Sequence, residues 1–184
     1  MYGIKNDKWI KEMVRTSSMI EPFVEELVSS GVISYGLSSY GYDFRLSDEF
    51  LVPLRGKKPF DPKSETTAFR FKRAKRMIIG PGWYVLGKSL EYFRIPKNVI
   101  GICVGKSTYA RSGIMVNITP LEPGWEGYIT VAISNLSQRK VILHAGEGIA
   151  QVLFFEGEEP FVSYADRKGK YHESKEIKPP LVKR

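Results

Sequence analysis

The clearest hydrophobic pattern lies in residues 127–135, where apolar and more polar side chains alternate one by one. One set is uniformly β-branched and apolar: Ile129, Val131 and Ile133. The alternate set is Tyr128, Thr130, Ala132 and Ser134. Because successive side chains of a strand point to opposite faces, the pattern predicts a strand with one face in the core and one face toward a more polar space.

Other short apolar runs repeat along the chain and are separated by Gly- and Pro-containing turns. The predicted strands include Phe50–Pro53, Met77–Ile79, Trp83–Leu86, Val99–Val104 (as a central strand), Lys140–Leu143 and Ile149–Phe155. Ser34–Leu46 favours strand and tight turn, and Ala145–Gly148 predicts a hairpin between the last two strands. Such spacing predicts an all-β fold with a few short helices, built as a distorted β-barrel or jelly-roll-like sandwich.

Helical periodicity is limited to short segments. Residues 6–16 predict a helix with Asn6 or Asp7 as its cap, and Ser107–Arg111 predicts a helical turn capped by Ser107. Residues 19–28 allow either a short helix or an irregular arm. Residues 55–67 read as a polar surface loop, and residues 164–184 as a loose end by composition. We expect a single domain over residues 1–184.

Composition narrows the function classes. The chain has 28 Lys and Arg against 20 Asp and Glu, a formal charge of +8, which suits an anionic partner. The densest basic stretch is Arg70–Arg76, but no nucleic-acid-binding motif accompanies it, so we favour a small polyphosphate ligand. No apolar run is long enough to cross a membrane, and no signal-peptide core is present.

Cysteine and histidine content excludes a further chemistry. Cys103 is the single cysteine and lies in an apolar run, which favours a buried residue over a nucleophile. A zinc deaminase needs a His/Cys/Cys or Cys₃ set near a glutamate, and this chain lacks it. The absence of possible internal disulfides agrees with a cytoplasmic location.

The segment Gly105–Arg111 is the first candidate for binding chemistry. A glycine and Lys106 precede a predicted helix start, where free N–H groups and a positive dipole end suit a phosphate group. A capped surface turn is the simpler alternative, and this segment taken alone slightly favours it.

Motifs over nearly the whole chain resemble the dCTP deaminase family, which is related to trimeric dUTPases. They are SYGLSSYGYDFRL at Ser34–Leu46, EYFRIPKNVIGICVGKS at Glu91–Ser107, GKSTYARSGIMVN from Gly105, EPGWEG from Glu122, GEGIAQVLF at Gly146–Phe154 and GKY at Gly169–Tyr171. The resemblance implies a dUTPase-type fold, a homotrimer, and dCTP, dUTP or dTTP as ligands. It implies zinc-free deamination of dCTP, with Mg²⁺ carried on the triphosphate.

The resemblance also assigns roles by position. The implied catalytic positions are Ser107, Arg111 and Ala132, with Glu122 as a further candidate base. The implied nucleotide-binding residues are Lys106, Ser107, Thr108, Tyr109, Ala110, Arg111, Thr130, Val131, Ala132, Gln151, Tyr164, Lys170 and Ser174. Some come from a neighbouring subunit, and the tail from Tyr164 corresponds to a segment that closes over the nucleotide.

Two positions depart from the family pattern. Ala132 stands where the family has its general-base glutamate, and Ser174 stands near the place of a nucleotide-holding glutamine. Because a methyl group cannot transfer a proton, we expect deamination to be impaired. An introduced change and natural loss of deamination both account for the alanine. A dUTPase and an inactive nucleotide-binding module remain the alternative functions.

Overall fold

The computed structural model describes residues 3–57, 59–63, 68–167 and 169–181. Within them the chain forms mainly strands and two short helices. In order these are β1 (Gly3–Ile4), α1 (Asp7–Ser17), β2 (Ile20–Glu21), β3 (Gly36–Leu37), β4 (Tyr42–Pro53), β5 (Phe69–Arg73), β6 (Arg76–Ile79), β7 (Tyr84–Arg94), β8 (Val99–Gly105), α2 (Ser107–Arg111), β9 (Ile114–Asn117), β10 (Glu126–Asn135), β11 (Val141–His144) and β12 (Gly148–Glu156).

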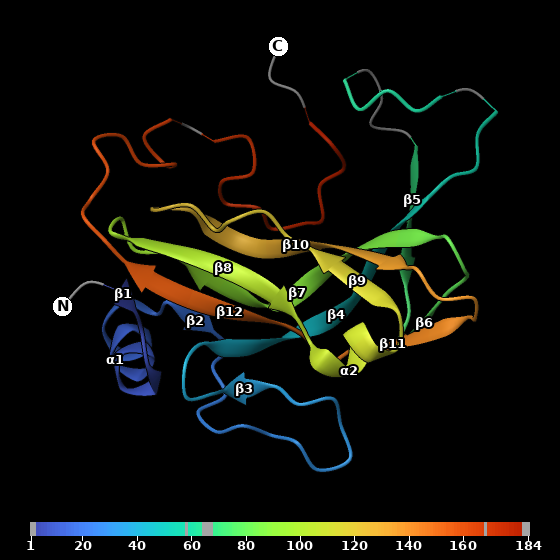
Figure 1. Cartoon of the computed structure of the whole chain (residues 1–184). Helices are drawn as coiled ribbons and strands as arrows, with labels where there is room; N and C mark the ends of the chain where they lie inside the picture. The colour runs from blue at the N-terminus through green and yellow to red at the C-terminus, as the bar shows by residue number, and fades with distance from the viewer. Residues whose placement is uncertain (1–2, 58, 64–67, 168, 182–184) are drawn as a thin grey trace.

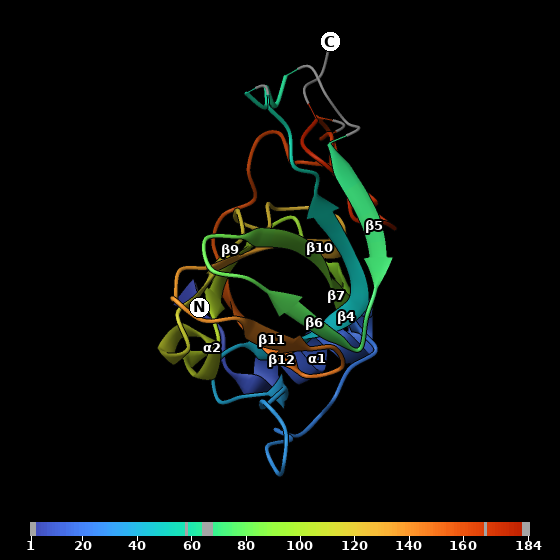
Figure 2. The same cartoon turned by 90° about the vertical axis from the view of Figure 1, so that its right-hand side faces the viewer.

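One antiparallel sheet curls into a half-barrel and confirms the predicted fold class. Its main strand order is β1-β12-β4-β7-β10-β9, with β8 attached to β12 and β5 attached to β4. Figure 2 shows β9, β10, β7 and β4 curving around one side of the barrel, with β11 and β12 on the opposite side. The long strands β4 and β7 extend well beyond the short runs that the sequence predicted.

The alternation in β10 creates the predicted core face. Ile129 is 2% exposed, and Val131 and Ile133 are fully buried. The opposite face is half-buried, and there Ala132 lies between Leu86 on β7 and Asn117 on β9 in the strand register. Burial of the β-branched row therefore aims residue 132 away from the core.

A buried ion pair joins β4 to β7 inside this fold. Arg45 Nε donates to Glu91 Oε1 at 2.7 Å, and the Arg45 backbone N–H donates to Glu91 Oε2 at 2.9 Å. Burial raises the pKa of the Glu91 carboxyl, against the opposing effect of Arg45. The pair satisfies charges that would otherwise be costly in the interior, and it holds the two long strands in register.

The first helix matches its prediction. Asn6 caps α1 by accepting a hydrogen bond from the Trp9 backbone N–H at 3.2 Å, and Ile10 is fully buried. Residues 19–28 form the irregular arm rather than a helix, with only β2 as regular structure. Of the predicted loop at residues 55–67, residues 58 and 64–67 lie outside the described residues.

Two local predictions were wrong. Lys106, not Ser107, occupies the N-cap position of α2, and no side chain caps this helix. The hairpin predicted at Ala145–Gly148 does not form, since β11 pairs with β6 while β12 pairs with β4 and β8. The turn is held by backbone bonds to other elements, including Ala145 N–H to Lys75 O at 2.9 Å, so tertiary contacts override the local signal.

The prediction of a central strand at Val99–Val104 was also wrong. Among the described residues, β8 pairs along its length with β12 alone, and its other edge makes a single bridge from Gly101 to Leu121. Val104 is 44% exposed. Among the described residues β8 is therefore close to an edge strand, exposed at its Val104 end.

Candidate functional site

A cavity of about 560 Å³ lies against the half-buried face of β10. Its lining comes from β7, β10, the loop after β9 and the C-terminal segment. The residues are Leu86, Asn117, Ile118, Thr119, Pro120, Leu121, Glu122, Trp125, Tyr128, Ile129, Thr130, Ala132, Tyr164, Lys170, Tyr171, Ser174, Lys178 and Pro180. The lining thus combines apolar side chains with Glu122 and two lysines.

Residue 132 has the orientation that the alternation predicts. Ala132 and Thr130 both line the cavity, and both are half-buried. Val131, which the resemblance places among the nucleotide contacts, has its side chain fully buried in the core. Thr130 and Ala132 therefore present their side chains to the cavity, whereas a ligand could reach Val131 only through its backbone.

The C-terminal segment forms one wall of the cavity. Tyr128 N–H donates to Ser174 O, and Glu173 N–H donates to Glu126 O, both at 2.9 Å. Trp125 Nε1 also donates to the Tyr171 carbonyl at 2.9 Å. These bonds extend the edge of β10 into the tail, so the segment that composition described as loose is anchored beside the site.

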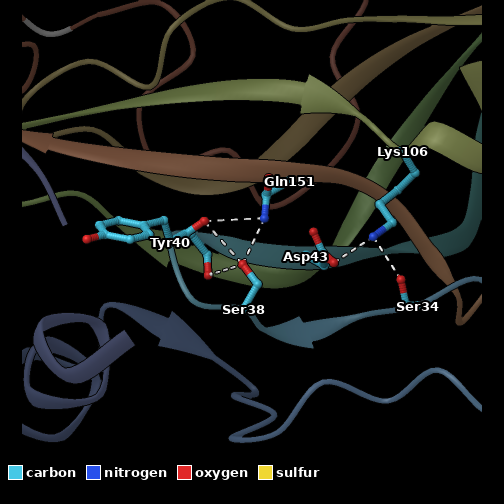
Figure 3. A network of polar contacts seen from close by, with 7 residues as sticks. Ser34, Ser38, Tyr40, Asp43, Lys106 and Gln151 are labelled. Carbon is cyan, nitrogen blue, oxygen red and sulfur yellow. Dashed lines mark hydrogen bonds and ion pairs between the residues drawn. The ribbon is translucent and has the colours of Figure 1, made fainter. Parts of the chain in front are cut away.

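A second polar cluster surrounds Lys106 (Figure 3). Lys106 Nζ lies 2.6 Å from Asp43 Oδ2 and 2.9 Å from Ser34 Oγ. Asp43 is 4% exposed, and its Oδ1 has no hydrogen-bond partner among the described residues. Burial raises the pKa of the Asp43 carboxyl, while the ammonium of Lys106 opposes that effect.

Gln151 belongs to the same region. Its Nε2 donates to Ser38 Oγ at 2.8 Å and to the Tyr40 carbonyl at 3.3 Å. Figure 3 shows Gln151 on β12 and Asp43 on β4 above the loop that carries the serines. The strand-and-turn segment predicted at Ser34–Leu46 therefore positions both Lys106 and Gln151.

Helix α2 offers its polar side chains to solvent. Ser107, Thr108 and Arg111 are exposed, and Ala110 is exposed beside them. Tyr109 differs, because its side chain is 3% exposed and its hydroxyl accepts a hydrogen bond from His144 N–H at 2.9 Å. The Tyr109 side chain therefore anchors α2 to the β11 end.

The predicted site residues fall into two groups within one chain. Ala132, Thr130, Glu122, Tyr164, Lys170 and Ser174 share the cavity. None of Lys106, Ser107, Thr108, Arg111 and Gln151 lines it. A single copy of the described chain consequently does not bring the expected phosphate-binding and base-binding residues to one place.

A comparison with models of protein families shows to which family the chain belongs. The family model described as dCTP deaminase-like matches residues 4–157. The chain belongs to the dCTP deaminase-like family. A dCTP deaminase of Herpetosiphon aurantiacus is 54% identical over 176 residues, covering 92% of this chain and 94% of that protein. A dCTP deaminase of Roseiflexus castenholzii is 53% identical over 186 residues, covering 97% and 99%.

A solved structure agrees at the level of fold. The crystal structure of 2'-deoxycytidine 5'-triphosphate deaminase from Agrobacterium tumefaciens superposes with a TM-score of 0.64 at 15% identity. The match covers 85% of this chain and 48% of that chain, so the present chain spans about half of its length. At this identity the likeness supports the dCTP deaminase-like fold alone.

The cavity of this dCTP deaminase-like chain includes residues that sequence reasoning did not single out. They are chiefly the loop Asn117–Pro120 with Trp125 and Tyr171. The available signal was position in the chain, since this loop lies between the Ser107 helix and the strand of Ala132, and both of these carried predicted roles. These lining residues come together through the β9–β10 pairing and through the docking of the C-terminal tail.

Other potential chemistries have weak structural support. Cys103 is half-buried on β8, and burial raises the pKa of its thiol to about 12. No three His, Cys, Asp or Glu side chains gather into a metal site within the described ranges. Among the same residues, no helix has the length and apolar character needed to cross a membrane.

Proposed function

We propose that this dCTP deaminase-like chain is an enzyme of pyrimidine deoxynucleotide metabolism that binds a deoxynucleoside triphosphate at the Ala132 cavity. The family reaction converts dCTP and water to dUTP and ammonia. The observation that supports the proposal most is family membership over nearly the whole chain, together with the cavity that Thr130 and Ala132 line. Ala132 is expected to slow the reaction.

The proposed assembly is a homotrimer. Its support is the separation of the two predicted groups, since the Lys106 group and the Ala132 cavity do not meet within one copy. Exposed apolar side chains at Val104 on β8 and Met115 on β9 provide surface for such contacts. In the proposal, α2 of one copy faces the cavity of another and completes a shared site.

Each residue then has a proposed role. Lys106, Ser107 and Thr108 would bind phosphates through charge-assisted hydrogen bonds. Ser107 and Arg111 would also face the reacting base, and Gln151, Tyr164, Lys170 and Ser174 would complete the nucleotide contacts. The tail from Tyr164, which already forms a cavity wall, would close over the bound nucleotide.

Magnesium enters this proposal through the substrate. The described residues offer no cluster of three potential metal ligands. In the proposal the oxygens of the triphosphate coordinate Mg²⁺, as is common for this ion. The bound ion would offset phosphate charge. The chain's own residues would orient the triphosphate by contacting its remaining oxygens.

The deamination step explains why residue 132 matters. Water must lose a proton as its oxygen attacks C4 of cytosine, and the departing amine must gain a proton. A carboxylate at residue 132 would point into the cavity and serve both transfers. The methyl group of Ala132 serves neither, so the proposal includes tight nucleotide binding with slow ammonia release.

A dUTPase is the second candidate, and one observation favours it. Glu122 lines the same cavity as Ala132. A carboxylate there would activate water for attack at the α-phosphate of dUTP, which yields dUMP and pyrophosphate. This reaction does not require the missing glutamate.

Incubation with dCTP and, separately, with dUTP tests these functions when ammonia and pyrophosphate are measured independently. Ammonia from dCTP supports the deaminase, even at a low rate. Pyrophosphate from dUTP supports the dUTPase. Calorimetric binding without either product would leave a nucleotide-binding module, and no binding of either nucleotide would contradict the proposal.

A further inference from the structure

The strands β7 and β10 do not pair evenly beside the candidate site. Tyr128 lies opposite Tyr92. Thr130, two residues later, lies opposite Lys88, so β7 advances four residues while β10 advances two. Such an irregularity is a bulge, and bulges next to functional sites commonly redirect side chains. This bulge lies immediately before Thr130 and Ala132, which both line the cavity.

A serine hydroxyl fills the gap in the strand pairing at this bulge. Ser89 is fully buried, and its Oγ accepts a hydrogen bond from the Ile129 backbone N–H at 2.8 Å. The same hydroxyl donates to the Glu91 carbonyl at 2.6 Å. Because a buried N–H without a partner is costly, this hydroxyl stabilises the offset pairing of the two strands.

The other neighbour of β7 is irregular at the same level. β7 lies between β4 and β10 in the sheet (Figure 1). β4 advances four residues, from Leu46 to Phe50, while β7 advances two. A cavity of about 370 Å³ opens at this place, and Lys88 and Ser89 are among its lining residues. β7 is therefore offset against both of its neighbours.

The offset decides which side chain of β7 lies beside residue 132. In the observed register Ala132 lies opposite Leu86. If the pairing of Tyr128 with Tyr92 continued without a bulge, four further residues along both strands would bring Lys88 opposite Ala132. Leu86 lines the cavity, and Lys88 is not among its lining residues. The bulge therefore replaces a cation by an apolar neighbour at the candidate site.

The charge of Lys88 is held one residue pair away. Its Nζ lies 2.5 Å from Glu49 Oε2 and 4.7 Å from the centre of the Tyr128 ring. Directly opposite residues of a sheet have Cβ atoms about 4.5–5.5 Å apart, so a lysine opposite residue 132 would pair with a carboxylate at that position. Such a pair lowers the pKa of the carboxylate and weakens it as a general base.

We propose that Ser89 is a positioning residue for the Ala132 cavity, because its hydroxyl fixes the offset that places Leu86 beside residue 132. This inference rests on the proposed deamination site. Ser89 contacts no ligand itself and acts through the backbone of Ile129. The simpler function of a buried hydroxyl is to stabilise the fold, and that function predicts lower stability without a change of register.

Cysteine cross-linking of the full chain tests the register directly. All proteins carry Cys103→Ala, so that the introduced pair holds the only thiols. One pair, Ala132→Cys with Leu86→Cys, reports the observed register. The other pair, Ala132→Cys with Lys88→Cys, reports the register without the offset. Each pair is treated with a short bifunctional thiol reagent in the unmodified, Ser89→Ala and Ser89→Thr forms.

Ser89→Ala should raise the ratio of the second cross-link to the first about ten-fold, because the Ile129 N–H loses its partner. Ser89→Thr keeps the hydroxyl and should keep the original ratio. Ile10→Val is the matched control, since Ile10 is fully buried on α1, which lies apart from β10 in Figures 1 and 2. It should lower the urea midpoint and leave the ratio unchanged. An unchanged ratio in a folded Ser89→Ala protein would overturn the positioning role, and so would an equal change in Ile10→Val.

A second experiment tests the consequence of the offset without altering the core. In the Ala132→Glu protein, Leu86→Lys places a lysine opposite residue 132 and should lower kcat for ammonia release about ten-fold. Tyr84→Lys adds the same charge opposite Ser134, one pair away, and should leave kcat unchanged. Equal effects of the two lysines would overturn the inferred effect of the offset.

The two experiments separate this inference from the proposed function. If Ser89→Ala does not fold, the two lysine variants decide the inference, because they leave the Ser89 bonds in place. Absence of ammonia from the Ala132→Glu protein would contradict the proposed function, and the cross-linking ratio would then decide the role of Ser89.

Discussion

At the scale of single residues, the proposed function depends most on position 132. The side chain is half-buried, lines the cavity and points away from the Ile129, Val131 and Ile133 face. A longer polar side chain would therefore extend into the cavity without entering the core. In the proposed reaction the chemistry depends on a carboxylate at residue 132, and the strand geometry directs that side chain into the cavity.

Ala132→Glu should increase dCTP deamination by on the order of 10²–10⁴-fold, because it supplies a general base at the proposed reacting carbon. The measurement is ammonia release under saturating dCTP. Ala132→Gln, with similar size and no carboxylate, is the matched control and should stay inactive. A folded Ala132→Glu protein that binds dCTP and releases no ammonia would contradict the deaminase proposal.

Lys106 shows why a binding residue needs a stability control. Lys106→Ala should weaken nucleotide binding about ten-fold or more, since charge-assisted hydrogen bonds contribute about 1.5–3 kcal/mol each. It should also destabilise the fold, because breaking a buried pair leaves the Asp43 carboxylate uncompensated at a cost of about 3–5 kcal/mol.

The double variant Lys106→Ala with Asp43→Asn separates the two effects. It should recover much of the lost unfolding free energy, because the buried charge is removed, while nucleotide binding stays weak. Urea denaturation measures the first quantity and calorimetry the second. If binding returns together with stability, Lys106 serves the fold and not the phosphates.

At the scale of elements, the docked tail is the main feature that local sequence signals did not show. Its backbone bonds to β10 and the Trp125–Tyr171 bond form a wall of the cavity. Gly127 makes this approach feasible, because its φ is +146° and a Cβ there would lie 2.9 Å from Ser174 N. The strand β10, with Gly127 at its start, and the C-terminal segment therefore pack together as one structural unit.

Removal of the chain from residue 163 onward should leave the barrel folded and weaken nucleotide binding. The core residues come from the earlier strands, with Ile177 as the tail's buried hydrophobic residue. Trp125 is 7% exposed with the tail in place, so its fluorescence emission should shift to longer wavelength. Unchanged emission and unchanged dCTP affinity would show that the tail does not contribute to the site.

At the scale of the whole molecule, one copy holds only part of the site in the proposed function. The Lys106 group and the Ala132 cavity are built on different parts of the barrel. β8 lacks a paired neighbour along its second edge among the described residues, and Val104 and Met115 are exposed. Association of copies would both cover apolar surface and bring the two groups together.

We expect a homotrimer in solution at micromolar concentration. Light scattering combined with size-exclusion chromatography should give three times the chain mass. The physical reason is that a shared site and a covered apolar face are obtained in the same contact. A monomer that still binds dCTP with full affinity would rule out the shared-site arrangement.

Sequence by itself determined the fold class, the strand carrying residue 132 and the outward direction of that residue. These features follow from local alternation and turn chemistry, which act over a few residues. The cap of the first helix was narrowed to Asn6 or Asp7, because a cap depends on a residue three positions from its partner, and the structure selects Asn6. The motif resemblance added the family, which the comparisons confirm.

Only the tertiary structure decided which strands pair and which site residues meet. The Ala145–Gly148 turn satisfies hairpin chemistry, but contacts with Lys75 and Leu46 send its two strands into different sheets. Lys106 pairs with Asp43, 63 positions away in sequence, and Trp125 beside β10 bonds to Tyr171 of the tail, 46 positions away. Such long-range pairings depend on the total apolar surface that the whole barrel buries. A short stretch of sequence does not specify that total.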